Sequence, residues 1–372
     1  MASAYSTTVA EGFSQRLMKE MYEKNLIDAI VNRDYEGEIN GVGSKLNILN
    51  FARISEKTYA NSALSADSLY ENNATLTIDT YKSFYWKEKT LARWLSYIKN
   101  PHATVVQQKA DERSKNMDEY VLGAYEDVGA GNWDGTSYTT GTVTVAADTG
   151  VVTGAGTTFT EAMEGKPFKA DGHTKWYRVK DYTSATAITI EDDSDDNTSA
   201  YTGGAIAGSS TYEIQANTAV AVTTSNLLTR VAALRLMLDS AERYGLSAVP
   251  ESDRWLVVPP EFQDLVVRAT GVALHVPDVY SNLVQKGFIG MLLGFKVFVS
   301  NRLTGDNTDG WRVLAGHPNW MTFAEKLLEA DIEEDLIGDF GSAYKDLFVY
   351  GKKVTDARRH FAASGFWTFT LS

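Results

Sequence analysis

Residues 287–303 constrain the fold of this chain more than any other stretch. Apolar residues surround Gly290 and Gly294, which serve as turn positions between two short predicted strands. The second strand alternates with a period of two over residues 295–300, as expected for a strand with two different faces. These residues therefore predict a pair of short, largely apolar strands.

A further strand and a short helix are predicted upstream. Residues 255–258 are all apolar and read as a buried strand, which Pro259 and Pro260 stop. Proline is favoured at the first position of a helix, so a short helix is expected over 260–267. The chain therefore combines helices and strands.

Composition bounds the class of protein. With 372 residues, 44% of them hydrophobic, the chain is expected to form two or three globular domains. No apolar run approaches the roughly 20 residues that span a bilayer, and no signal peptide is recognised at the N-terminus. Cysteine is absent, which excludes disulfides and thiolate chemistry. The net charge of −13 argues against tight binding of nucleic acid.

The first third of the chain alternates between helical and extended patterns. An amphipathic helix is predicted over 13–31, and residues 45–90 are predicted to form a long β-excursion with a polar tip. Residues 81–99 mix basic and aromatic side chains, which suits either a nucleic-acid platform or a two-sided strand that leads into a helix; we favour the strand. Helices are then predicted over 103–128 and from Ser225 to Gly245.

Composition changes abruptly between the last two predicted helices. No leucine occurs between Leu122 and Leu227, and threonine and glycine dominate from Asp134 to Gln215. Short β-branched runs separated by turn residues predict a small all-β module. The expected strands are 142–145, 151–153, 176–179, 187–190 and 212–214.

Signatures of catalysis are missing. The sequence has no phosphate-binding loop, no dinucleotide-binding glycine motif, no nucleophile elbow and no zinc-binding histidine pair, so no enzyme and no cofactor is predicted. The acidic run 191–197 is a weak candidate for a metal site, and a solvated hairpin tip is the interpretation we favour, because adjacent carboxylates repel one another. Its candidate ligands are Asp192, Asp193, Asp195 and Asp196.

The order of these elements resembles that of tailed-bacteriophage major capsid proteins of the Hong Kong 97 type. The segments that carry the resemblance are 255–267, 287–303, 314–318 and 349–354. The β-module is itself similar to small β-modules of phage virion proteins. The resemblance implies an α+β fold with an N-terminal arm, an extended loop, a peripheral domain with a spine helix, an axial domain and an all-β insertion domain.

The implied domain boundaries follow from this order. They are 1–43 for the arm and first helix, 44–90 for the extended loop, 91–133 for the first part of the peripheral domain, 134–217 for the inserted β-domain, 218–245 for the spine helix, 246–343 for the axial domain and 344–372 for the closing strands of the peripheral domain.

The resemblance also implies a function. The chain is expected to be a virion capsid protein that forms pentamers and hexamers of an icosahedral shell, assembled in the host cytoplasm around double-stranded DNA without sequence-specific contacts. A separate scaffolding protein, a portal and decoration proteins are the implied partners. A tail or fibre protein and a cellular nanocompartment shell are the alternatives. The candidate interface residues are Phe13, Arg53, Lys57, Tyr59, Tyr70, Phe288 and Arg302.

Overall fold

The computed structural model describes residues 26–35, 45–48, 74–89, 101–194, 200–240, 248–269, 288–333 and 341–370. The chain divides into two compact units. Unit 1 consists of Met1–Asn116 and Met321–Lys353, and unit 2 consists of Met117–Trp320 and Val354–Ser372. Within the described residues, no helix has the length and apolar character needed to cross a membrane.

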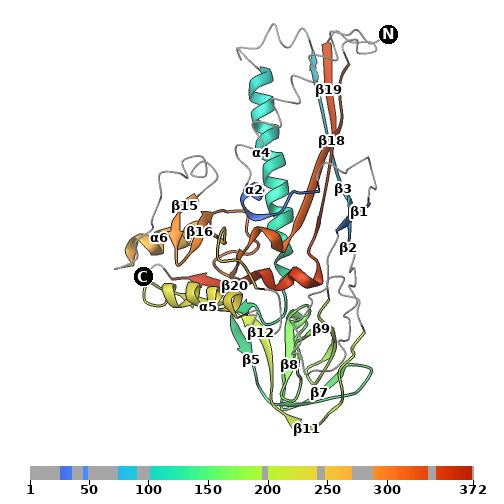
Figure 1. Ribbon diagram of the computed structural model, residues 1–372, viewed down its shortest axis with the longest axis vertical. Coiled ribbons are helices and arrows are strands. Elements are labelled where there is room, and N and C mark those ends of the chain that lie inside the picture. Colours follow the sequence, from blue (N-terminus) through green and yellow to red (C-terminus); the bar gives the residue numbers. More distant parts are fainter. Residues whose placement is uncertain are drawn as a thin grey trace, which may run out of the picture. The chain divides into compact units, whose positions relative to one another are not determined.

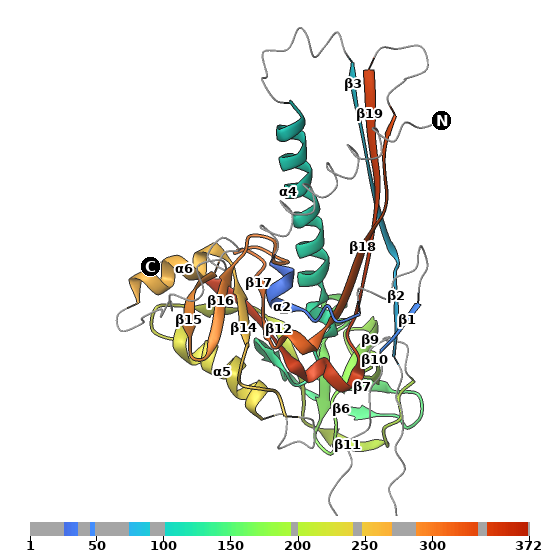
Figure 2. The ribbon, with the colours of Figure 1, turned by 45° about the horizontal axis from the view of Figure 1, so that its top comes forward.

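Unit 1 is built on an antiparallel sheet of three long strands. Its order is β18 (Thr322–Glu333), β19 (Gly341–Lys353) and β3 (Thr80–Lys89). A separate hairpin-like pair consists of β1 (Lys45–Ile48) and β2 (Ala74–Thr77), which run antiparallel (Figure 2). The short helix α2 (Ile27–Ile30) and the start of α4 (Pro101–Leu122) belong to the same unit.

The β1–β2 pair is fixed by alternating burial. In β1, Leu46 and Ile48 are buried while Lys45 and Asn47 are exposed. Leu76 and Ile78 come from the return segment, and all four pack with Ala324 of β18 and Val349 of β19. A shift of one residue in the pairing would turn these side chains to solvent, so this cluster sets the register.

Unit 2 contains a second sheet of seven strands (Figure 1). Its main path runs β13 (Val220–Val222), β20 (Ala362–Phe369), β17 (Trp311–Gly316), β14 (Trp255–Val258), β16 (Phe295–Val299) and β15 (Phe288–Leu292). The short strand β4 (Trp133–Asp134) also pairs with β20. The helices α5 (Leu227–Asp239) and α6 (Pro260–Arg268) both contact β20. Every residue of β14 is buried, as expected for a central strand.

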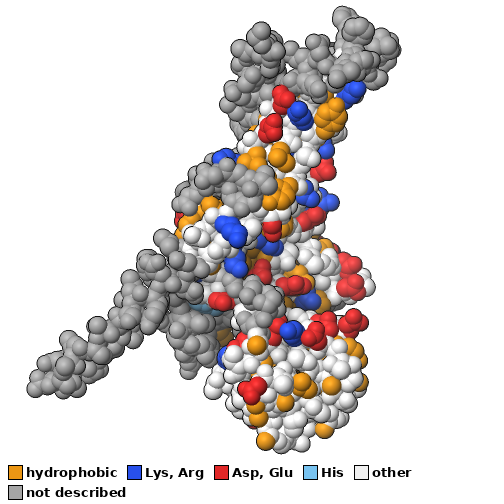
Figure 3. Space-filling view, turned by 90° about the vertical axis from the view of Figure 1, so that its right-hand side faces the viewer, with side chains coloured by type: hydrophobic (Ala, Val, Ile, Leu, Met, Phe, Trp, Pro, Cys, Tyr) orange, Lys and Arg blue, Asp and Glu red, His pale blue; other side chains and the backbone are white. Residues whose placement is uncertain are grey.

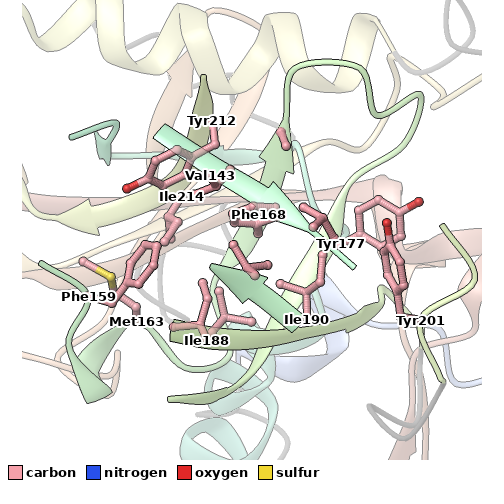
Figure 4. Close-up of a cluster of buried hydrophobic side chains, with 14 residues drawn as sticks. Val143, Phe159, Met163, Phe168, Tyr177, Ile188, Ile190, Tyr201, Tyr212 and Ile214 are labelled. Carbon is pink, nitrogen blue, oxygen red and sulfur yellow. The ribbon is translucent and has the colours of Figure 1, made fainter. Parts of the chain in front are cut away.

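The remaining strands of unit 2 form an eight-stranded sheet from residues 136–218, which we call the β-module. In chain order they are β5 (Thr136–Tyr138), β6 (Thr142–Val145), β7 (Val151–Ala155), β8 (Pro167–Ala170), β9 (Tyr177–Ser184), β10 (Ala187–Asp192), β11 (Ile206–Ser210) and β12 (Tyr212–Thr218). Aromatic and β-branched side chains fill its core (Figure 4). On the face that Figure 3 shows, the side chains at the lower end, where Figure 1 labels β7 and β11, are mostly uncharged.

A glycine in the β-module gives a sharp test of packing. Gly150 has φ +63°, and a Cβ atom added there would lie 2.2 Å from the carbonyl oxygen of Ile190. We expect Gly150→Ala to lower the free energy of unfolding by about 2 kcal/mol or more, because backbone strain and a backbone clash add together. Gly165→Ala is the matched control, since φ is +73° there but no atom lies within 4 Å of the added Cβ.

That control isolates the steric part of the effect. Gly165→Ala is expected to cost only the left-handed backbone penalty of about 1 kcal/mol. Urea unfolding monitored by tryptophan fluorescence compares the two variants. Equal losses of stability would contradict the clash at Gly150.

Many predicted elements are confirmed. The strand at 255–258 is β14, the helix after Pro259 is α6 with Pro260 at its first turn, and the strand at 142–145 is β6. The predicted strand pair within 287–303 is β15 and β16, which pair antiparallel. Leu293 and Gly294 form the turn between them with positive φ angles, whereas Gly290, which was also predicted as a turn position, lies within β15 beside an irregularity in the pairing.

The two compact units group the chain differently from the predicted domains, whose boundaries remain a prediction. The chain leaves unit 2 after Trp320 and returns to it at Val354, whereas the predicted axial domain ran to 343. The charged stretch after 321 was not predicted as a strand, yet it forms β18. The closing segment 344–372 is also split, because β19 pairs with β18 in unit 1 whereas β20 pairs with β17 in unit 2.

The helix predicted as the spine lies in unit 2. It is α5, which contacts β20 of the seven-stranded sheet. Most of the predicted helix 13–31 lies outside the described residues, and only its end is seen, as α2. The tip of the 45–90 excursion also lies outside them, whereas the β1–β2 pair of that excursion is described.

Candidate functional site

The three-stranded sheet of unit 1 has a partly open face that we take as the candidate contact surface. Tyr81 and Tyr85 of β3 are exposed, whereas Phe84 is buried, because neighbouring side chains of a strand point to opposite faces. Tyr85 is paired with Lys345 of β19. A groove of 370 Å³ is lined by Ser83, Phe84, Tyr85, Glu329, Lys345, Asp346 and Leu347.

The β1–β2 pair limits this surface at one end. Val349 of β19 lies on the same face of the strand as Lys345 and Leu347. It is fully buried in the cluster that includes side chains of β1 and β2. Tyr81, which is paired with Val349, is still partly exposed, and the exposure is larger at Tyr85, which is paired with Lys345. The candidate contact surface is therefore a short strip that combines an aromatic ring, an aliphatic side chain and charges of both signs.

The opposite face of the same sheet is held by α4. Arg113 donates a hydrogen bond of 2.8 Å to Asp346, and its guanidinium lies 4.5 Å from the ring centroid of Phe348. The ammonium of Lys109 lies 4.8 Å from the ring centroid of Phe84. Among the described residues, these contacts cover one face of the sheet, whereas Tyr81 and Tyr85 on the other face are exposed.

Unit 2 contains a buried charged junction between the β-module and its surroundings. Asp193, just after β10, accepts hydrogen bonds from Nε and Nη2 of Arg178 at 3.0 and 2.8 Å. Nη2 of Arg359 forms an ion pair with the same carboxylate at 2.8 Å. The second carboxylate oxygen accepts the backbone N–H of Ala130 at 2.7 Å. One carboxylate therefore links the β-module to two segments of the chain outside it.

The acidic run is thus more than a solvated hairpin tip. Asp192 is bound by Lys175 and Thr202. Burial acts to raise the pKa of Asp192, but these hydrogen bonds outweigh it and hold that pKa below its ordinary value. Asp195 and Asp196 lie outside the described residues. Among the residues that are described, no group of three metal-ligating side chains comes together.

The other predicted interface residues are placed only in part. Arg302 forms an ion pair with Asp118 in unit 2. Phe288 is the first residue of β15, and its side chain is outside the described part. Phe13, Arg53, Lys57, Tyr59 and Tyr70 also lie outside it. The structure brings none of the described candidates together into one site.

Sequence reasoning missed the buried ion pairs. Arg359 is far from Asp193 in the sequence, as is Arg113 from Asp346, and the arginines lie in no recognisable motif. Asp193 lies in the acidic run, where it was considered only as a metal ligand and not as the partner of Arg178 and Arg359. An isolated arginine in a strand resembles any exposed arginine until the tertiary structure buries it. No local signal in the sequence distinguishes these residues.

Lys166 makes the stability of unit 2 depend on pH. Its ammonium donates to the carbonyl of Asn217 at 2.9 Å. Burial, aided by the charge of Arg312, lowers the pKa of Lys166 from 10.5 to about 8. The unfolded chain binds this proton more tightly than the folded protein does. The folded protein is therefore most stable above the unfolded pKa of Lys166, and it loses that stability as the pH falls through the folded pKa.

We expect the free energy of unfolding to rise by about 2 kcal/mol between pH 7 and pH 9.5 relative to Lys166→Met. Urea unfolding of both proteins at the two pH values measures this difference. Parallel pH dependences in the two proteins would show that Lys166 is not the responsible group.

Comparison with solved structures identifies the fold. A chain from Mycobacterium phage Che8 is 18% identical, with a TM-score of 0.52, and the match covers 93% of this chain and 91% of that one. A chain from the capsid of Ralstonia phage GP4 is 13% identical, with a TM-score of 0.51, and the match covers 91% of this chain and 87% of that one.

Sequence comparison adds no relative. No model of a protein family matches the chain, and no curated protein matches it either. The structural matches extend along nearly the whole of each chain, so the chain has the mixed helix and strand fold found in a bacteriophage capsid. The resemblance predicted from residues 255–267 and 287–303 is confirmed at the level of the fold.

Proposed function

We propose that this chain is the major structural subunit of a bacteriophage capsid. Many copies form pentamers and hexamers, which close into an icosahedral shell around double-stranded DNA. The observation that carries this proposal is the likeness in fold to the GP4 capsid chain, which extends over 91% of this chain. The role is structural and involves no catalysis.

We assign the peripheral and axial roles of a capsid subunit to different units of the chain. We assign the peripheral role to unit 1, because its long strands and the start of α4 form an extended element. We assign the axial role to the sheet that contains β14, β15 and β16, in keeping with the resemblance carried by their sequences. A separate scaffolding protein, a portal and decoration proteins are the partners, and assembly takes place in the host cytoplasm.

The candidate contact surface is where we place a second copy of this chain. It combines an exposed tyrosine with Lys345 and Glu329, so it offers an apolar anchor with charges of both signs around it. An acidic protein with a net charge of −13 repels its own copies at long range. Copies therefore need local apolar contacts, such as one through Tyr85, to associate. The same negative charge means that the shell encloses DNA without binding it tightly.

Electron microscopy of the purified protein tests the proposed function. Closed shells, ring-shaped capsomers or tubes of polymerised subunits, alone or after addition of the scaffolding protein, are the expected result. Elongated trimers or tail-like rings would instead assign the chain to a tail or fibre. Shells that enclose protein cargo and no nucleic acid would assign it to a cellular compartment.

A substitution tests the contact surface. Tyr85→Asp is expected to leave the monomer folded, because the ring is exposed, but to reduce particle formation at least tenfold by placing a charge in an apolar contact. Val151→Asp, at an exposed position of β7 in the β-module, is the matched control and should assemble normally. Sedimentation and circular dichroism measure assembly and folding. Normal particles from Tyr85→Asp would rule out this surface.

A further inference from the structure

The β-module begins and ends on the same side of one strand. In β4, Trp133 is paired with Ser364 and Asp134 with Gly365, and the two strands run parallel. In β13, Val220 is paired with Trp367 and this pairing is also parallel. The other side of β20 is occupied by β17 from Ala362 to Trp367, so β4 and β13 must share the remaining side.

The two short strands are in register with one another. Between the partners of β4 and β13 only Phe366 is left on β20. Counted forward from β4, the residue opposite Phe366 is Gly135; counted backward from β13, it is Ala219. Both strands run in the same direction, so a single residue in place of 135–219 would complete one continuous strand along β20.

Hydrogen bonds continue this ladder at both ends. The backbone N–H of Ser364 donates to the carbonyl of Asn132 at 2.9 Å, and that of Thr370 donates to the carbonyl of Val222 at 3.0 Å. The residues on either side of the β-module thus use the same edge of β20 over its length. β4 and β13 therefore pair with β20 as two parts of one strand, with a single position of β20 left between them.

The first and last residues of the β-module lie close together in space. A Cβ atom added at Gly135 would lie 2.7 Å from the Cα of Ala216 and 3.4 Å from the carbonyl oxygen of Thr218. All strand pairs of the eight-stranded sheet join β5 to β12 among themselves, and the buried hydrophobic cluster in Figure 4 contains only residues between Val143 and Ile214. The β-module thus has a sheet and a core of its own.

From this geometry we infer that residues 135–219 are inserted into a single edge strand of the seven-stranded sheet, and that the rest of the chain folds and associates with its own copies without them. The second half of this inference rests on the proposed function; the first half does not. The β-module is then an appendage, available for contacts other than those that close the shell.

The contacts that would be lost upon removal hold the module in place but build no part of the sheet. They include the ion pair between Asp193 and Arg359 and the hydrogen bond from Gly131 to Gln215. Without the module, Arg359 retains its hydrogen bond to the carbonyl of Asp127 and the carboxylate of Asp356 at 3.9 Å. Its guanidinium also becomes accessible to water.

The experiment replaces residues 135–219 of the full chain with one threonine. The matched control joins Asp134 directly to Val220 with no residue between them. Without the bridging residue, either β4 or β13 must shift by one position, which turns side chains such as the buried Val222 toward solvent. Circular dichroism, thermal unfolding and electron microscopy are applied to both variants and to the full chain.

The one-residue variant is expected to be a cooperatively folding protein that melts about 5 °C or more above the control. Failure of both variants to fold, or equal melting temperatures, would overturn the insertion into a single strand. Where the full chain forms particles, the one-residue variant should form them too, and its failure to do so while folded would overturn the second half of the inference. If the full chain forms no particles, the melting comparison still decides the first half.

Discussion

Replacement of Asp193 with alanine is expected to lower the free energy of unfolding of unit 2 by about 3–5 kcal/mol. The reason is that the side chains of Arg178 and Arg359 are only 2% and 5% exposed and share this one carboxylate. Removal of the carboxylate leaves two buried cations close together. Arg178 keeps hydrogen bonds to the carbonyls of Gly165 and Val128, but these do not neutralise its charge.

Differential scanning calorimetry of the full chain measures this effect. Asp192→Ala is the matched control one residue away, because Asp192 pairs with Lys175, whose side chain is half exposed. A pair in which one partner is half exposed to water contributes about 0–1 kcal/mol. We expect the transition of unit 2 to fall by several degrees in Asp193→Ala and to move little in Asp192→Ala. Equal shifts would mean that the Asp193 junction has no special role.

Replacement of Asp346 with alanine is expected to destabilise unit 1 by about 3 kcal/mol. Asp346 and Arg113 form a 2.8 Å ion pair in which their side chains are 4% and 9% exposed. The Nη1 atom of Arg113 is buried and has no hydrogen-bond partner among the described residues. Once Asp346 is gone, the guanidinium retains the ring of Phe348 as its favourable neighbour, and a ring face offsets only part of the cost of burial.

A double variant separates the charge from the shape. Arg113→Met combined with Asp346→Leu should recover much of the lost stability, because a well-packed apolar pair replaces a buried ion pair at little cost. Lys345→Ala is the control on the same strand, since Lys345 pairs with Asp331 and both side chains are about half exposed. Chemical denaturation of the four proteins provides the comparison. A double variant as unstable as Asp346→Ala would refute the explanation by an unpaired charge.

Local patterns predicted individual elements well. Alternation located β16, a β-branched run between turn residues located β6, and a short apolar run that ends at two prolines located β14, because each of these signals lies within a few neighbouring residues. Proline at the start of α6 did the same for a helix. The order of these segments was enough to indicate the capsid-type fold that the structural comparison supports.

Pairing between distant segments could not be predicted in this way. The strand β18 carries charges at Glu325, Lys326 and Glu329, so it has no clear apolar alternation, and it is a strand because β19 pairs along its length. From closeness in the sequence, the final strand β20 would be expected to pair with β19. It pairs with β17 instead. Several partners fit such a strand equally well, and only the packing of the whole chain selects one.

Sequence patterns were sufficient to locate several strands, turns and one short helix and to mark residues 134–217 as a region of distinct composition, since local backbone preferences and side-chain alternation act over a few residues, but they did not locate β18. The position of Asp193 between two buried arginines, and the alignment of β4 and β13 along β20, became visible in the folded chain alone. Burial of a charge and the register of two strands depend on residues far apart in the chain, and no short segment contains that information.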